Sequence, residues 1–184
     1  FNYGLLGGVG EIRGNWPKGT NDFYVGDVLP VVALEVPIDL DGDSEPDTLV
    51  QHAVTTRGPR AGTNSPPGQP NIFWGFEAKP GFAAPEPNEK PALSTEPETW
   101  PEFWPDQPTW IDPATGRAQW NGFFGRGIRN ADLESYFWMD DHNDEELFSE
   151  FGFIPDTLDT SRRGQGLEVK VRGLQWSQFL AQDA

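Results

Sequence analysis

The residues best suited to chemistry form a short acidic loop, DLDGDSEPD, at positions 39–47. Every second position of this loop is acidic, and the side chains are Asp39, Asp41, Asp43, Glu45 and Asp47. Calcium takes roughly six to eight oxygen ligands, so several carboxylates that converge from one tight turn suit it well. Without a cation, so many acids in so short a loop would repel one another. We therefore predict that these five residues form a calcium site, the alternative being a solvated acidic hairpin tip.

The spacing of the loop resembles the DxDGDGxPD loops of thrombospondin type 3 repeats and, more loosely, the EF-hand loop. Two positions depart from those patterns. Ser44 stands where such loops usually have glycine, and Val50 stands where an EF-hand has its bidentate glutamate. The missing ligands would come from elsewhere in the chain or from water. The resemblance implies weak binding, with a dissociation constant of roughly 10⁻⁴–10⁻³ M.

A second acidic cluster, DDHND, occupies positions 140–144. Its carboxylates and the histidine within it could hold a further cation. The alternative is the start of a helix, where acidic side chains are favoured by the helix dipole, followed by solvated charge.

Signs of catalysis are sparse. Neither of the two histidines lies in an HExxH motif, and no GxSxG sequence is present. Two pairs of carboxylates could in principle hydrolyse a glycosidic bond: Glu102 with Asp106, and Glu134 with Asp140. Among 29 acidic residues such pairs arise by chance. We therefore expect a protein without an active site.

The elements around the acidic loop can be predicted from side-chain alternation. Residues 28–38 and 48–56 alternate apolar and polar side chains and are rich in β-branched residues, which indicates two strands. Because they flank the acidic loop, they should form a hairpin. Residues 131–140 and 166–176 also read as strands, and 143–151 reads as a short helix that Asn143 caps and Gly152 ends.

Residues 100–144 contain five of the eight tryptophans and form the most aromatic part of the chain. A buried aromatic side chain removes roughly 150–250 Å² from water, so these rings can supply most of a core. The alternative is that some of them line a binding face for sugar or protein. A row formed by Trp100, Trp104 and Trp110 at the surface would favour carbohydrate binding.

Composition limits the fold class and the partners. The chain has 184 residues with 21 glycines and 18 prolines, which favours short strands joined by many turns. We predict a single mainly β domain over 1–184, an antiparallel sandwich-like fold with long Pro/Gly/Trp-rich loops and one short helix. The net charge of −16 argues against nucleic acid and anionic lipid as partners, and no apolar run is long enough for membrane insertion.

Five ordered segments carry a family resemblance: 15–27, 93–106, 120–127, 130–146 and 166–183. They are similar to the amino-terminal region of large secreted bacterial proteins exported by the type IX secretion system. The resemblance implies export, a β-rich fold, and a place outside a Gram-negative cell or on its surface. It also implies that the chain is a fragment of a longer secreted protein. It provides no activity that can be assigned to individual residues.

Together these observations predict a non-enzymatic extracellular structural or adhesive protein, such as a subunit of a surface assembly or filament. Its partners would be other protein subunits or further copies of itself. One alternative is a carbohydrate-binding or glycoside-processing module that contacts polysaccharide. Another is an accessory subunit of a larger complex.

Overall fold

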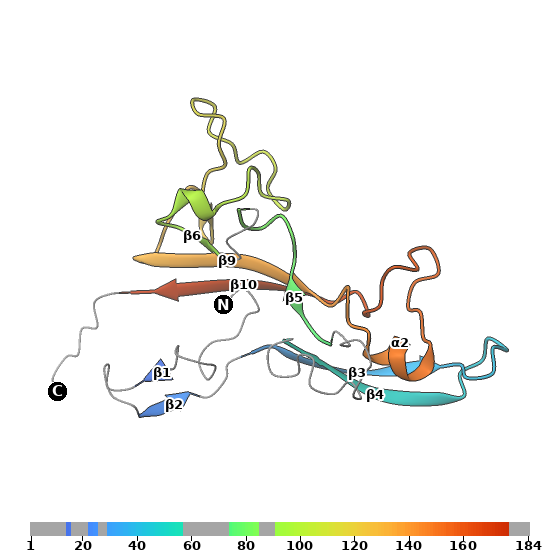
Figure 1. Cartoon of the computed structure of the whole chain (residues 1–184). Helices are drawn as coiled ribbons and strands as arrows, with labels where there is room; N and C mark the ends of the chain where they lie inside the picture. Colours follow the sequence, from blue (N-terminus) through green and yellow to red (C-terminus); the bar gives the residue numbers. More distant parts are fainter. Residues whose placement is uncertain (1–13, 16–21, 26–28, 57–73, 85–90, 177–184) are drawn as a thin grey trace, which may run out of the picture. The chain divides into compact units, whose positions relative to one another are not determined.

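The computed structural model describes residues 14–15, 22–25, 29–56, 74–84 and 91–176 (Figure 1). The predicted fold class is confirmed, because the chain is mainly β, its strands pair antiparallel, and its single described α-helix is short. The described residues form two compact units, the first within the ranges 3–78 and 139–169 and the second within 79–138 and 170–176. The single domain over 1–184 stays a prediction.

The predicted hairpin around the acidic loop is the main element of the first unit. Strands β3 (Val31–Ile38) and β4 (Thr48–Thr55) pair antiparallel along their full length, and the acidic loop joins them. The side chains on one face are half-buried or buried, and those on the other face are exposed, as the alternation predicts. A short pair, β1 (Gly14–Asn15) with β2 (Phe23–Val25), belongs to the same unit.

Helix α2 (Glu146–Phe151) packs its buried Leu147 against Val36 and Ile38 of β3. The helix begins later than predicted, and the expected cap by Asn143 is wrong. Glu145 stands at the cap position without a side-chain bond, while Asn143 donates to the Glu77 carboxylate at 3.0 Å. Within the described residues, no helix has the length and apolar character needed to cross a membrane.

The predicted end of the helix at Gly152 is confirmed. Gly152 has φ of 67°, and its N–H donates to the carbonyl of Phe148. A left-handed glycine of this kind is a common way for a helix to stop, because glycine has no Cβ to clash in that conformation.

The predicted strands at 131–140 and 166–176 are confirmed as β9 (Leu133–Asp140) and β10 (Glu168–Gln175). These two neighbouring strands contribute residues to both units. β9 also pairs with β5 (Glu77–Ala78) and with β6 (Ala92–Leu93). Every side chain of β9 is half-buried or buried, as expected for a strand covered on both faces. The sequence also predicts a short strand at 71–76. It falls partly outside the described residues, and its described part, 74–76, belongs to none of the named strands.

The second unit is built around aromatic rings. Its short elements are η1 (Pro97–Thr99), β7 (Asn121–Gly122) and β8 (Gly125–Arg126). The buried cluster includes Phe82, Trp104, Trp120 and Tyr136, with further tryptophans packed against it. The rings of Trp104 and Trp120 meet edge to face, with centroids 5.8 Å apart. The interpretation of this aromatic stretch as core therefore holds for these rings.

The sequence also predicts an edge strand or packed arm over 1–14 and a long loop over 57–70. Residues 1–13 and 57–70 lie outside the described residues.

Candidate functional site

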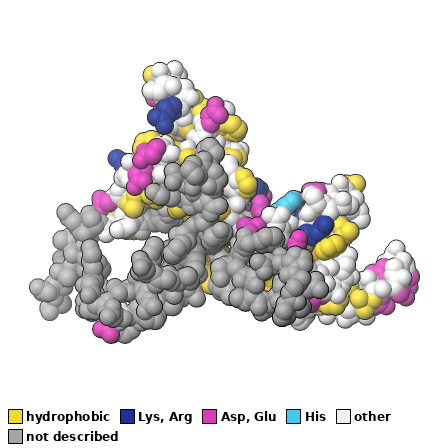
Figure 2. Space-filling view, in the orientation of Figure 1, with side chains coloured by type: hydrophobic (Ala, Val, Ile, Leu, Met, Phe, Trp, Pro, Cys, Tyr) yellow, Lys and Arg dark blue, Asp and Glu magenta, His cyan; other side chains and the backbone are white. Residues whose placement is uncertain are grey.

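The acidic loop brings together three of its five predicted ligands at the end of the β3–β4 hairpin. Carboxylate oxygens of Asp39, Asp41 and Asp43 lie within 4.8 Å of one another, and all three side chains are exposed. Figure 2 shows acidic side chains gathered at the tip of this hairpin. Glu45 and Asp47 are outside the group, and Asp47 accepts a hydrogen bond from the backbone N–H of Leu40 at 2.7 Å instead.

The acidic loop is held in a tight turn by hydrogen bonds from its own backbone N–H groups to its own carboxylates. Asp39 accepts the N–H groups of Gly42 at 2.6 Å and Ser44 at 2.8 Å, and Asp43 accepts that of Glu45 at 2.9 Å. The Gly42 and Ser44 donors lower the pKa of Asp39, so its charged form is favoured. Such turns are typical of aspartate in loops. The loop therefore closes through its own carboxylates.

Ser44 has φ of 73° and is the one described non-glycine residue with positive φ. A non-glycine residue in this left-handed conformation costs roughly 1–2 kcal/mol. The loop therefore carries backbone strain at the position where Ser44 departs from the resembling pattern.

The carboxylates of the second acidic cluster, at positions 140–144, do not converge on one site, since Asp141 and Asp144 have different partners. Asp141 is fully buried and accepts the backbone N–H groups of Gln165, Gly166 and Leu167 at 2.8, 3.1 and 2.9 Å. Burial raises the pKa of Asp141, although these three donors oppose the rise. A Cβ at Gly164 would lie 1.8 Å from the Asp141 carbonyl oxygen, so only glycine fits beside it. Asp141 therefore fixes the segment that leads into β10.

Asp144, from the same cluster, lies against a histidine that the sequence pattern did not connect with it. His52 Nε2 is 3.4 Å from Asp144 Oδ2, and His52 Nδ1 is 3.4 Å from Glu146 Oε2. His52 and Asp144 are 5% and 2% exposed. Sequence reasoning missed this group because its members are far apart in the chain. The only available signal was the alternation along 48–56, which puts His52 on the same face as Val50 and Val54.

The carboxylate pair Glu134 and Asp140, which we considered for glycoside hydrolysis, is not poised for it. Glu134 is buried and accepts hydrogen bonds from Trp120 Nε1 at 2.8 Å and from the backbone of Asn130 and Ala131. Burial pushes its pKa up, but these donors and the charge of Arg172 outweigh it and leave the pKa below its usual value. A proton-donating acid needs a raised pKa instead. Asp140, its expected partner, belongs to the other unit.

Asp106, from the pair with Glu102, accepts hydrogen bonds from donors in the same aromatic unit. It accepts hydrogen bonds from the Tyr136 hydroxyl at 2.6 Å and from Asn121 Nδ2 at 2.9 Å, and Lys170 lies 3.5 Å away. Burial, and then Asp106 itself, raise the pKa of Tyr136. Its expected partner, Glu102, is exposed. Glu134 and Asp106 therefore both serve the packing of this unit.

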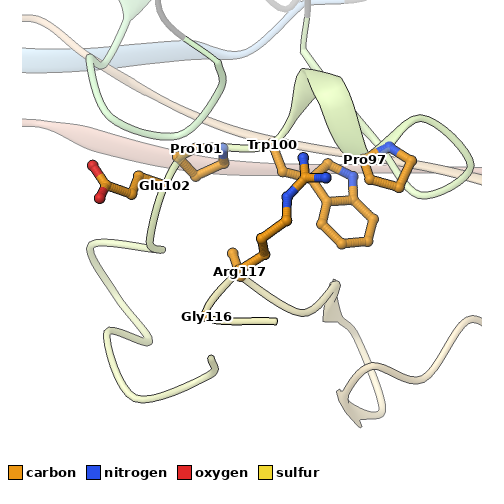
Figure 3. Close-up of a pocket in the computed structure, with 7 residues that line it drawn as sticks. Pro97, Trp100, Pro101, Glu102, Gly116 and Arg117 are labelled. Atoms are coloured by element: carbon orange, nitrogen blue, oxygen red, sulfur yellow. The ribbon is translucent and has the colours of Figure 1, made fainter. Parts of the chain in front are cut away.

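A shallow pocket of about 280 Å³ lies beside Trp100 (Figure 3). Its lining comes from two loop segments and consists of Pro97, Trp100, Pro101, Glu102, Gly116, Arg117 and Ala118. Trp100 is half-buried and donates from Nε1 to the Leu93 carbonyl at 2.6 Å, while Arg117 reaches toward its ring and Glu102 points away. Trp104 is fully buried and Trp110 half-buried, so the three tryptophans do not form an exposed row.

Among the described residues of the second unit, the most exposed aromatic side chains lie in the turn between β7 and β8. Phe123 and Phe124 are 62% and 58% exposed, and their rings meet edge to face with centroids 4.9 Å apart. A Cβ at Gly122 would lie 1.9 Å from the Ile128 carbonyl oxygen, so the turn is tight. Arg126 anchors it by donating to the Ile111 carbonyl at 3.0 Å. The turn therefore holds both rings in water.

Comparison with family models, with curated proteins and with solved structures finds no match for this chain. The geometry of the described residues is accordingly the basis for assigning a function.

Proposed function

We propose that this chain is a non-enzymatic structural or adhesive protein that associates through the turn containing Phe123 and Phe124, here called the aromatic tip. The observation that carries the proposal is the exposure of two neighbouring phenylalanines on a tightly constrained turn. Exposed aromatic side chains held in a fixed conformation are typical of interaction sites, because little conformational entropy is lost when they are buried.

The energy available at the aromatic tip is substantial. Full burial of a phenylalanine side chain is worth about 1.5–3 kcal/mol, and the tip offers two such side chains together with the half-exposed Ile128. Arg126 and Arg129 lie close to the tip in a chain whose net charge is −16. A basic border of this kind complements the acidic surface of a second copy, so we propose self-association as the mode of assembly.

Sedimentation velocity over a range of concentrations tests this proposal. We expect the intact chain to self-associate, and the double variant Phe123→Ser/Phe124→Ser to associate at least about tenfold more weakly, since each lost aromatic contact removes more than about 1.4 kcal/mol. Leu158→Ser is the matched control, because Leu158 is 98% exposed and lies outside the tip. A chain that stays monomeric, or a double variant that associates like the control, would contradict the proposal.

We further propose that the acidic loop binds calcium weakly and stiffens the hairpin. The proximity of the Asp39, Asp41 and Asp43 oxygens supports this assignment. We expect millimolar calcium to raise the thermal midpoint of the intact chain, and Asp41→Asn/Asp43→Asn to abolish that rise, since site affinity follows ligand charge. An equal rise with magnesium would contradict a site that selects calcium, and no rise with either ion would argue that the carboxylates serve the loop alone.

The location of the protein is proposed on the resemblance alone. The five ordered segments support export through the type IX secretion system and a role outside a Gram-negative cell or on its surface. The same resemblance supports a place within a longer secreted protein, and it leaves an accessory role in a larger complex as an alternative.

A second candidate function is carbohydrate binding at the pocket beside Trp100. The observation that favours it is an indole ring next to Arg117 in an open pocket, since sugars commonly bind against an aromatic face with polar groups nearby. Burial of Trp104 reduces the surface available for this purpose.

A further inference from the structure

We propose that His52, Asp144 and Glu146 bind a divalent transition-metal ion of the zinc type inside the first unit. One nitrogen or oxygen from each of the three side chains can be chosen so that all lie within 4.8 Å of one another. This group is separate from the exposed acidic loop, and it combines an imidazole with two carboxylates. Imidazole suits zinc and its neighbours in the first transition series, whereas calcium and magnesium prefer oxygen alone.

The fold holds the three donors firmly. His52 lies on the inward face of β4 and pairs across the hairpin with Leu34. Glu146 is the first residue of α2, and the following Leu147 is buried against β3. Asp144 is fixed because its Oδ1 accepts the backbone N–H of Glu146 at 3.2 Å. The donors therefore come from two segments that core packing already holds together.

The spacing of the donor atoms fits a shared ion better than direct hydrogen bonds. His52 Nε2 lies 3.4 Å from Asp144 Oδ2, whereas a charged N–H···O hydrogen bond is about 2.7–2.9 Å long. Two atoms that each lie about 2.0–2.1 Å from a tetrahedral zinc are about 3.3–3.4 Å apart. The His52 Nε2 and Asp144 Oδ2 pair has the length of one such edge.

Asp144 supplies independent evidence for a ligand. Its side chain is 1% exposed, and its Oδ2 atom is buried without a hydrogen-bond donor. Buried carboxylate oxygens nearly always have a partner, so an oxygen left in this state beside two other metal-type donors indicates a cation at this place.

A divalent ion at this place can bond to the imidazole and to the two carboxylates together. Water would complete the coordination shell, as in zinc sites with three protein ligands.

Zinc titration by calorimetry tests the proposal on the Asp41→Asn/Asp43→Asn chain, in which the exposed loop no longer competes. We expect one zinc ion per chain and a higher thermal midpoint. His52→Gln and Asp144→Asn should each weaken zinc binding by at least about 100-fold. Losing a residue that only hydrogen-bonds to a metal ligand lowers affinity roughly 10–100-fold, and losing the ligand itself should lower it further. His142→Gln, which replaces the other histidine, is the control and should bind normally.

Because the ligand variants could also fail to fold, cobalt binding to the same chain with its ligands intact gives a second measurement. Tetrahedral cobalt bound to nitrogen and oxygen should give strong visible absorption that stoichiometric zinc removes. The proposal is overturned if no zinc binds to this chain, or if folded His52→Gln protein gains as much thermal stability from zinc as the intact site. Either result would leave a protonated His52 between two carboxylates as the explanation of the cluster.

Discussion

Replacing Trp104 with alanine should destabilise the second unit by about 3–5 kcal/mol, the range for removing a large buried aromatic side chain. Trp104 is completely buried, and its Nε1–H donates to the Gln119 carbonyl at 2.6 Å. Its ring contacts those of Trp100, Trp120 and Tyr136. Since domains are stable by only about 5–15 kcal/mol, this single change should bring the unit close to unfolding.

Urea unfolding followed by circular dichroism measures this loss. Trp176→Ala is the matched control, because Trp176 is 56% exposed in the segment after β10 and its removal should cost less than about 1 kcal/mol. Equal losses for the two variants would show that the buried rings are not the core of the unit.

Replacing Glu134 with alanine should cost about 3–5 kcal/mol, which is the expected penalty for breaking a buried charged network. The change would leave the Trp120 indole N–H and the backbone N–H groups of Asn130 and Ala131 without their acceptor. It would also remove the negative charge that compensates Arg172. Unfolding in urea measures the loss, and Glu102→Ala at an exposed position is the control.

The lowered pKa of Glu134 gives this prediction a pH signature. A carboxyl whose pKa is lower in the folded state stabilises the protein above its unfolded pKa, near about 4.3, and loses that contribution as pH falls through the folded value. The stability difference between the intact chain and Glu134→Gln should therefore be largest near neutral pH and shrink below about pH 4. A difference that grows in acid would contradict the assignment of Glu134 as an ionised hydrogen-bond acceptor.

The local elements could be predicted from the sequence because their signals are local. Alternating apolar residues on Val32–Ile38 placed the inward face of β3, and the β-branched residues of 48–56 identified its partner. Gly152 marked the end of the helix because a left-handed residue is needed there. The density of rings between 100 and 138 identified the core of the second unit.

The polar contacts could not be predicted, because their partners are distant in sequence. Asn143 has the right chemistry for a helix cap, but Glu77 binds its side chain instead. Asp141 and Asp144 lie in a run of acids that suggests solvated charge, and both are buried by segments that meet only in the fold. The exposure of Phe123 and Phe124 was equally hidden, since two adjacent phenylalanines ordinarily indicate core.

The most direct test of the account is a two-dimensional NMR spectrum of the tryptophan indole N–H groups, recorded in water and after transfer to heavy water, with and without soluble oligosaccharides. The account holds that the aromatic rings form a core and that the chain binds through the aromatic tip. We therefore expect the indole N–H groups of Trp104 and Trp120 to exchange slowly, and no indole signal to shift when sugar is added. Rapid exchange of both groups, or a saturable shift of the Trp100 signal with sugar, would contradict it and favour the pocket as the functional site.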